Sequence, residues 1–283
     1  MIKRFTEKTQ NLVEYARGRR LVGLAAEIAF YEALAIFPFL MFCLALIGLL
    51  PKEGLVQAGL SMLDEIGPPS AVSLISSWVE LVRRGASVPL MSLGAIAGLW
   101  IGSNGVGAFQ RAFANVDPNK HRQPVWKQVG QQVYLTLLGA FLLIAVLVFW
   151  VVWPAVLAWV LQMVGATKTV PTMLGLVRTP LVFLLVVGGL LLFYQALAPH
   201  PGGWRAHLPG SVLATSFFWT FSYGFSYYIR HLSLFETIYG SLAAVMILLI
   251  WLQALNLSIL LGEGWNAQEE KMVKVSTIPG VKS

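Results

Sequence analysis

Long apolar stretches alternate with short polar ones along most of the chain, and six of the apolar stretches are long enough to cross a bilayer as helices. At a rise of about 1.5 Å per residue, about 20 residues cross a hydrocarbon core of about 30 Å. The six spans are predicted at residues 28–50, 88–109, 133–153, 181–197, 212–228 and 242–261. The pattern therefore predicts an all-α, polytopic membrane protein with six transmembrane helices.

A different pattern fills the segment between the first two spans. Apolar residues recur there at helical spacing over 55–66 and again over 72–82, and Gly67-Pro68-Pro69 separates the two sets. The opposite face of each set is too polar to lie against lipid. We expect a pair of amphipathic helices that lie on the outer surface or cap the bundle.

Charge indicates how the spans are oriented. In the six-span layout, 14 of the 20 Lys and Arg residues fall on the side of the two termini and 6 on the opposite side. Because cytoplasmic loops carry an excess of Lys and Arg, both termini are predicted to be cytoplasmic and the amphipathic pair to be outside. The chain then divides into a cytoplasmic N-terminal segment (1–27), a transmembrane domain (28–262) and a cytoplasmic tail (263–283).

Composition excludes a water-soluble protein. Hydrophobic residues make up 57% of the chain and charged residues 12%, and the mean hydropathy is +0.71. The net charge of +7 is explained by cytoplasmic loops, so no nucleic-acid partner is expected. The only cysteine, Cys43, excludes an internal disulfide. No cleavage pattern precedes the first span, so we expect the N-terminal segment to remain on the mature chain.

The first span carries an acidic residue inside the hydrocarbon core. With the span centred near Phe39, Glu32 lies about 10 Å from the midplane, whereas Glu27 lies in the interface. An acid at that depth costs about 1–3 kcal/mol, so it should face protein or water. Glu32 and Tyr31 are therefore candidates for substrate binding or coupling, and Pro38 is a candidate hinge. The alternative is that Glu32 only bonds a neighbouring helix and Pro38 only fits its helix to the bundle.

Polar residues in other spans extend the candidate site. Two amides in the last span are three residues apart and share a face, where they bond across to another helix or line a cavity. Small and aromatic polar residues of the fifth span line a wet cavity or lie in an interfacial belt. The further candidates for substrate binding or coupling are Asn104, Tyr223, Gln253, Asn256 and Glu263.

The second span is rich in glycine at one spacing. Gly94, Gly98 and Gly102 follow one another at four-residue intervals, which leaves one helix face nearly bare. Such a face lets another backbone approach closely, and we expect a helix-packing seam here. The alternative is that the glycines only provide flexibility. Arg111, at the inner end, is expected to extend to the lipid headgroups.

Several short motifs carry a resemblance to a known family. They are Ala29-Phe30-Tyr31, Phe37-Pro38, Leu208-Pro209-Gly210, Tyr239-Gly240-Ser241-Leu242-Ala243-Ala244-Val245, Trp251-Leu252, Leu260-Leu261-Gly262 and Asn266-Ala267. Together they resemble the YihY/BrkB family of bacterial inner-membrane proteins. The resemblance implies a six-helix protein of the inner membrane. In this chain Glu263 lies one position before the usual acid of that family.

Enzymatic chemistry finds no support in the sequence. Some members of the family carry a ribonuclease label, but a metal-dependent nuclease needs clustered His and Asp ligands. The four histidines are predicted to lie in different loops on both faces: His121, His200, His207 and His231. No P-loop or dinucleotide fingerprint occurs either. We therefore expect no enzyme activity, no metal and no cofactor.

Three functions remain open at this point. The first is transport or flipping of a lipid or another amphipathic molecule, which Glu32, Pro38 and the resemblance favour. The second is an ion- or proton-coupled carrier of small polar solutes, with Glu32 as the titratable group. The third is a non-catalytic scaffold for envelope assembly. The expected partners are membrane lipids, and formation of a homo-oligomer is left open.

Overall fold

The computed structural model describes residue 14 and residues 16–48, 60–61, 63–64, 68–85, 88–116, 124–163, 170–199, 202–232 and 242–276. Within these ranges the regular structure is helical, so the all-α class is confirmed. The helices are α2 (Leu21–Gly48), α4 (Pro69–Gly85), α5 (Val88–Val116), α6 (Val125–Met163), α7 (Val170–Leu197), α8 (Trp204–Leu232) and α10 (Leu242–Ser276).

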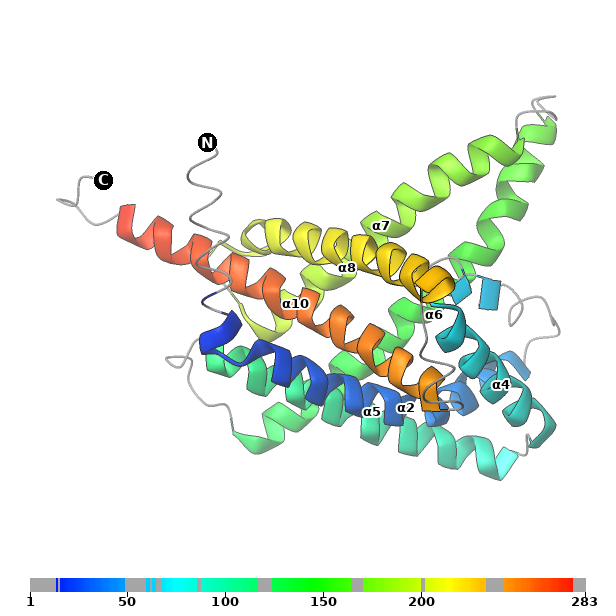
Figure 1. Ribbon diagram of the computed structural model, residues 1–283, viewed down its shortest axis with the longest axis horizontal. Coiled ribbons are helices and arrows are strands. Elements are labelled where there is room, and N and C mark those ends of the chain that lie inside the picture. Colours follow the sequence, from blue (N-terminus) through cyan, green and yellow to red (C-terminus); the bar gives the residue numbers. More distant parts are fainter. Residues whose placement is uncertain are drawn as a thin grey trace.

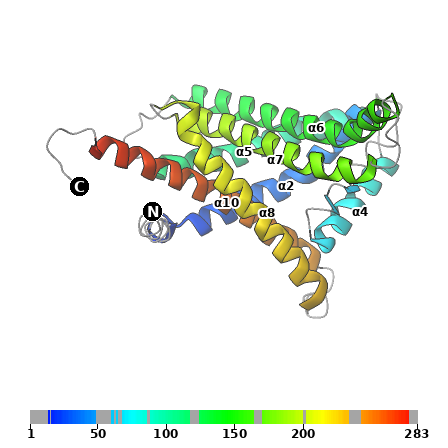
Figure 2. The same ribbon diagram turned by 90° about the horizontal axis from the view of Figure 1, so that it is seen from above.

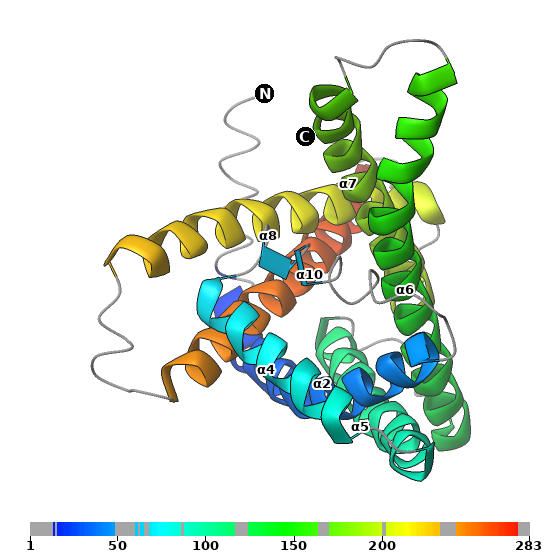
Figure 3. The same cartoon turned by 90° about the vertical axis from the view of Figure 1, so that its right-hand side faces the viewer.

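Helix α10 is the element against which most of the others are arranged. It packs against α8 on one side and against α2 and α4 on the other (Figures 1 and 3). Helix α5 lies along α2, and α6 and α7 complete the bundle beyond α5 (Figure 2). Consecutive long helices alternate in direction, so the start of α2 and the end of α10 lie at the same end of the molecule (Figures 1 and 2).

Within the described residues, three helical stretches are long and apolar enough to cross a membrane. They are Leu21–Pro38, Thr179–Leu197 and Leu242–Gln268, which correspond to the first, fourth and last of the predicted spans. The protein is thus a membrane protein with several candidate spans. The complete six-span layout stays a prediction.

Helix α2 begins before the predicted start of the first span at residue 28. Leu21, Ala25 and Ile28 recur at helical spacing and are fully buried, so the packed face extends back past Glu27. Arg20, immediately before the helix, has a φ of 53°, a left-handed conformation that separates α2 from the turn that precedes it. At the other end of the chain α10 continues past residue 262 to Ser276.

The main apolar core joins α2, α5, α7 and α10. Its buried members include Ile28, Phe109, Phe113 and Leu260. Phe109 packs edge-to-face against Phe193, with ring centroids 5.1 Å apart. Since lipid tails are as apolar as these side chains, close packing rather than removal from water holds such a core together in a bilayer.

Three glutamines link α5, α6 and α7 beside this core. Gln110 donates a hydrogen bond to Gln131 at 3.1 Å and accepts one from Gln132 at 2.7 Å. Gln131 in turn donates to the backbone oxygen of Ala196 at 2.5 Å. Side-chain amides that bond across helices in this way contribute about 0.6–2 kcal/mol each in membrane bundles, so they fix how these helices are placed.

Helix α4 corresponds to the amphipathic helix predicted at 72–82. Its apolar residues Ala71, Ile75 and Val79 are buried against Ala29 of α2 and Leu248 of α10, so α4 caps the bundle. The first amphipathic set, 55–66, falls largely outside the described residues.

Candidate functional site

A partly open groove of about 410 Å³ lies among α2, α5, α6 and α7, and Ile259 of α10 contributes to its lining. Most of the lining is Gly, Ala, Val, Leu, Ile and Phe, and the polar members are Glu32 and Thr136. The Thr136 hydroxyl already donates to the backbone oxygen of Gln132 at 2.8 Å. Among the described residues, the groove therefore presents one strongly polar group, the carboxyl of Glu32, among apolar walls.

Glu32 is held by an amide from the centre of the bundle. Asn256 of α10 donates a hydrogen bond from Nδ2 to Oε2 of Glu32 at 2.6 Å. The Asn256 side chain is fully buried, and its Oδ1 has no hydrogen-bond partner among the described residues. The two residues are 224 positions apart in sequence. The acid is thus fixed in position by a neutral partner that supplies no compensating charge.

The other candidates from the spans do not join this pair. Gln253 donates instead to the backbone oxygen of Val22 at 3.2 Å and so links α10 to α2. Tyr31 packs against the main core. Asn104 and Tyr223 are exposed and are not part of the groove lining. Of the polar candidates, the structure brings together only Glu32 and Asn256.

The glycines of α5 lie beside the groove. Gly98 and Gly102 form part of its lining, and a Cβ added at Gly102 would lie 3.0 Å from Cγ2 of Thr136 on α6. Gly94 is buried. The absence of side chains here leaves room for the groove and also brings α5 close to α6. The predicted packing seam over all three glycines stays a prediction.

Two further expectations concern single residues of α2 and α5. Pro38 lies inside α2, and the helix continues beyond it to Gly48. The role of Pro38 as a hinge stays a prediction. The expectation that Arg111 extends to the lipid headgroups stays a prediction. Its guanidinium forms an ion pair with Glu27 at 2.6 Å, because α5 lies along α2 and brings the opposite charges together.

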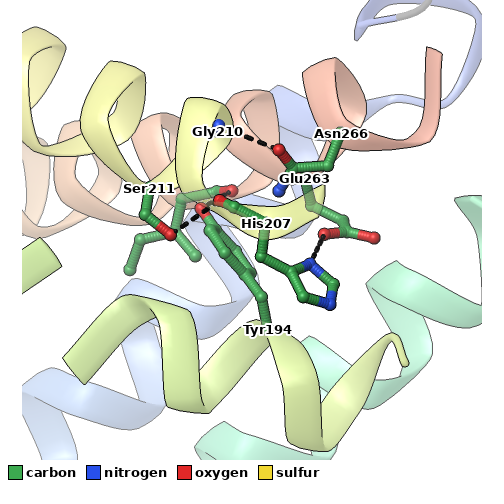
Figure 4. A network of polar contacts seen from close by, with 7 residues as sticks. Tyr194, His207, Gly210, Ser211, Glu263 and Asn266 are labelled. Atoms are coloured by element: carbon green, nitrogen blue, oxygen red, sulfur yellow. Dashed lines mark hydrogen bonds and ion pairs between the residues drawn. The ribbon is translucent and has the colours of Figure 1, made fainter. Parts of the chain in front are cut away.

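A second polar centre, the buried polar cluster, consists of Tyr194, His207, Glu263 and Asn266 (Figure 4). All four side chains are buried, with Glu263 only 1% exposed. Nδ1 of His207 lies 3.9 Å from Oε2 of Glu263. The Tyr194 hydroxyl donates to the backbone oxygen of Ile259 at 2.7 Å. The cluster joins α7, α8 and α10, and Ile259 connects it to the lining of the groove.

Two glycines bring α8 and α10 together beside this cluster. A Cβ added at Gly262 would lie 2.5 Å from the backbone oxygen of Gly210 and 2.5 Å from the Tyr194 hydroxyl. The close approach lets the backbone N–H of Gly210 donate to Oδ1 of Asn266 at 2.8 Å (Figure 4). The motifs Leu208-Pro209-Gly210 and Leu260-Leu261-Gly262 therefore meet in space.

The buried polar cluster corrects the placement of one histidine and adds residues to the site. His207 was expected in a loop but lies within α8, where α8 packs against α7 and α10. Glu263 was a candidate, whereas His207, Tyr194 and Asn266 were not. A signal was present, because Glu263 and Asn266 are three residues apart and share a helix face. Among the described residues, no group of three or more His, Cys, Asp or Glu is placed to hold a metal ion.

Known proteins resemble this chain over nearly its whole length. The family model described as virulence factor BrkB matches residues 12–280. The chain is 29% identical over 256 residues to YfkH of Bacillus subtilis (strain 168), whose name calls it ribonuclease-like, and the match covers 89% of this chain and 90% of YfkH. It is 28% identical over 268 residues to a UPF0761 membrane protein of Tolumonas auensis, with 88% and 80% covered. No solved structure matches the chain.

Proposed function

The chain belongs to the virulence factor BrkB family, and from this premise we propose that it moves a lipid or another amphipathic molecule across or within the bacterial inner membrane. The single observation that supports this function is the groove that contains Glu32. Its volume of about 410 Å³ is within the range of about 300–1,000 Å³ of small-molecule sites. Apolar walls with one acidic group suit a molecule that has a hydrocarbon part and a polar end.

The walls also favour an amphipathic substrate over a small polar solute. A small polar solute would lose its hydration in the groove and find few partners there beyond Glu32, at a cost of several kcal/mol. A hydrocarbon chain loses nothing on leaving lipid for apolar walls. The proposed activity involves movement only, with no bond made or broken.

We propose in addition that the chain has six spans with both termini in the cytoplasm. The alternating directions of α2, α5, α6, α7, α8 and α10 support this layout (Figures 1 and 2), and so does the distribution of Lys and Arg over the loops.

This layout is tested with single cysteines in a Cys43→Ala background. Cysteines at Lys120 and Arg205 are expected to be protected from membrane-impermeant thiol reagents in intact cells, because both positions are cytoplasmic in the layout. A cysteine at Lys52 is expected to react. Arg205 is exposed at the start of α8, while Lys52 and Lys120 lie outside the described residues. Labelling in the opposite pattern would overturn the layout.

The groove is tested by filling it. Gly139 of α6 lines the groove, and a Cβ added there meets no other atom within 4 Å. Gly139→Leu is therefore expected to leave the fold intact and to place a bulky side chain where the substrate lies. In vesicles that contain purified protein and labelled phospholipids, the variant is expected to lower the rate of transbilayer movement by about tenfold or more.

The matched control is Gly130→Leu. Gly130 is on the same helix, an added Cβ there also meets nothing within 4 Å, and the residue is not part of the groove lining. This variant is expected to move lipid at the wild-type rate. If wild-type protein moves no amphipathic molecule in vesicles, the proposed function is wrong. If both leucine variants move lipid at the wild-type rate, the groove is not the route.

A further inference from the structure

We propose that the groove selects amphipathic molecules whose polar end carries an ammonium group. This selectivity rests on the proposed function and adds a substrate class to it. It follows from the groups that the groove presents: among the described residues, Glu32 is the ionisable residue of the lining, and no Lys, Arg or His is part of it. A ligand with a cationic end would complement the groove, whereas an anionic headgroup would meet a like charge and no donor built for phosphate.

The surroundings of Glu32 favour the binding of a cationic group. In the described part of the chain, Asn256 supplies the hydrogen bond that Glu32 receives, at Oε2. Asn256 is neutral, and Arg111 of the neighbouring helix is not part of the groove lining. A carboxylate in apolar surroundings without a counter-ion is costly, so a bound cation attracts it more strongly there than in water and offsets part of that cost.

The chemistry of the bond favours a primary ammonium. Any of its three N–H groups can donate a charge-assisted hydrogen bond to the carboxylate, at about 2.7–2.9 Å. A quaternary ammonium has the charge but no N–H donor. The hydrocarbon part of the ligand would lie along the apolar walls formed by Val106, Leu135, Leu142 and Leu190. The two parts of the groove together match an aminophospholipid or a free alkylammonium ion.

The experiment compares headgroups on the same labelled acyl chains. Vesicles with purified protein receive phosphatidylethanolamine, phosphatidylcholine or phosphatidylglycerol, each with a fluorescent acyl chain, and transbilayer movement is followed by quenching with an impermeant reductant. Wild-type protein is expected to move phosphatidylethanolamine at least about tenfold faster than phosphatidylglycerol, with phosphatidylcholine between them. Glu32→Gln is expected to abolish this preference, because the amide keeps the shape of the acid but not its charge.

Two variants separate loss of charge from loss of fold. Glu32→Asp keeps the carboxylate and is expected to keep the preference. Glu27 lies on the same helix as Glu32 but pairs with Arg111 and is not part of the groove lining. Glu27→Gln is therefore expected to leave the preference unchanged. Melting of each variant in detergent confirms that the protein is folded. If Glu32→Gln is unfolded, Glu32→Asn is compared with Glu32→Asp. The short amide is expected to lose the preference that the short acid keeps, and a folded Glu32→Asn that retains the preference overturns the inference.

The outcomes keep the two proposals apart. If wild-type protein moves all three lipids at equal rates, or if folded Glu32→Gln retains the preference, the ammonium inference is wrong and the proposed function stands. If no lipid moves at all, the proposed function fails. Titration with decylammonium chloride then distinguishes a lipid headgroup from a free alkylammonium ion. If decylammonium binds in a way that depends on Glu32 but no lipid moves, the ammonium class is supported and a lipid is excluded as the ligand. If decylammonium does not bind, the ammonium class is wrong as well.

Discussion

Gly210→Ala is expected to lower the free energy of unfolding by about 3 kcal/mol, which is the upper end of the usual range for overpacked sites. A Cβ at this position would overlap the backbone oxygen of Gly262 and the side-chain amide of Asn266. Backbone atoms of a neighbouring helix cannot move aside as a flexible side chain does, so α8 would have to separate from α10. The hydrogen bond from Gly210 to Asn266 would be lost at the same time.

The measurement is thermal unfolding of the purified protein in a mild detergent. Gly224→Ala is the matched control, because Gly224 lies in the same helix and an added Cβ there meets nothing within 4 Å. Alanine has the better helix propensity, so the control is expected to be neutral or slightly stabilising. Gly262→Ala is expected to behave like Gly210→Ala. Equal unfolding temperatures for Gly210→Ala and Gly224→Ala would show that α8 and α10 are not in backbone contact here.

His207→Leu is expected to cost about 1–3 kcal/mol of stability. The substitution leaves Glu263, which is 1% exposed, without the imidazole that lies 3.9 Å from its Oε2. The penalty comes from the carboxyl group that remains buried, so replacing that group as well should restore part of the loss. His207→Leu with Glu263→Gln is therefore expected to be more stable than His207→Leu alone.

A double-mutant cycle over these two positions measures their coupling, which we expect to be about 1–3 kcal/mol. The comparison is the exposed ion pair between Arg111 and Glu27, whose side chains are 55% and 41% exposed. There Arg111→Leu is expected to cost no more than about 1 kcal/mol, since water replaces the lost partner. A coupling near zero for His207 and Glu263 would mean that the two side chains do not interact in the buried polar cluster.

The sequence by itself determined the class of the protein and the type of its elements. Apolar stretches of about 20 residues have few alternatives to membrane helices, because every backbone polar group must be satisfied within the bilayer. The last span followed from this rule, whereas the amphipathic helix at 72–82 followed from apolar residues at helical spacing. The start of α2 did not, because a criterion based on apolar runs stops at Glu27, whereas the helix continues wherever one face is packed.

The sequence also identified Glu32 as unusual, because an acid within a span is costly wherever it points. It identified the shared face of Gln253 and Asn256 through helical periodicity. Periodicity fixes the face of a helix but not the helix that the face meets. The two amides on that face accordingly have different partners: Asn256 bonds Glu32, and Gln253 bonds the backbone at Val22.

Only the tertiary structure decided which polar residues form a site. His207 and Glu263 lie on different helices, and only the approach of α8 and α10 at Gly210 and Gly262 brings the two side chains together. The groove is likewise invisible in the sequence, since its lining comes from five helices and consists mostly of residues that any membrane span contains. Local patterns determine whether each helix is transmembrane or amphipathic, but contacts between distant segments depend on how all the helices pack together. That packing brings Asn256 to Glu32 and leaves the groove beside them.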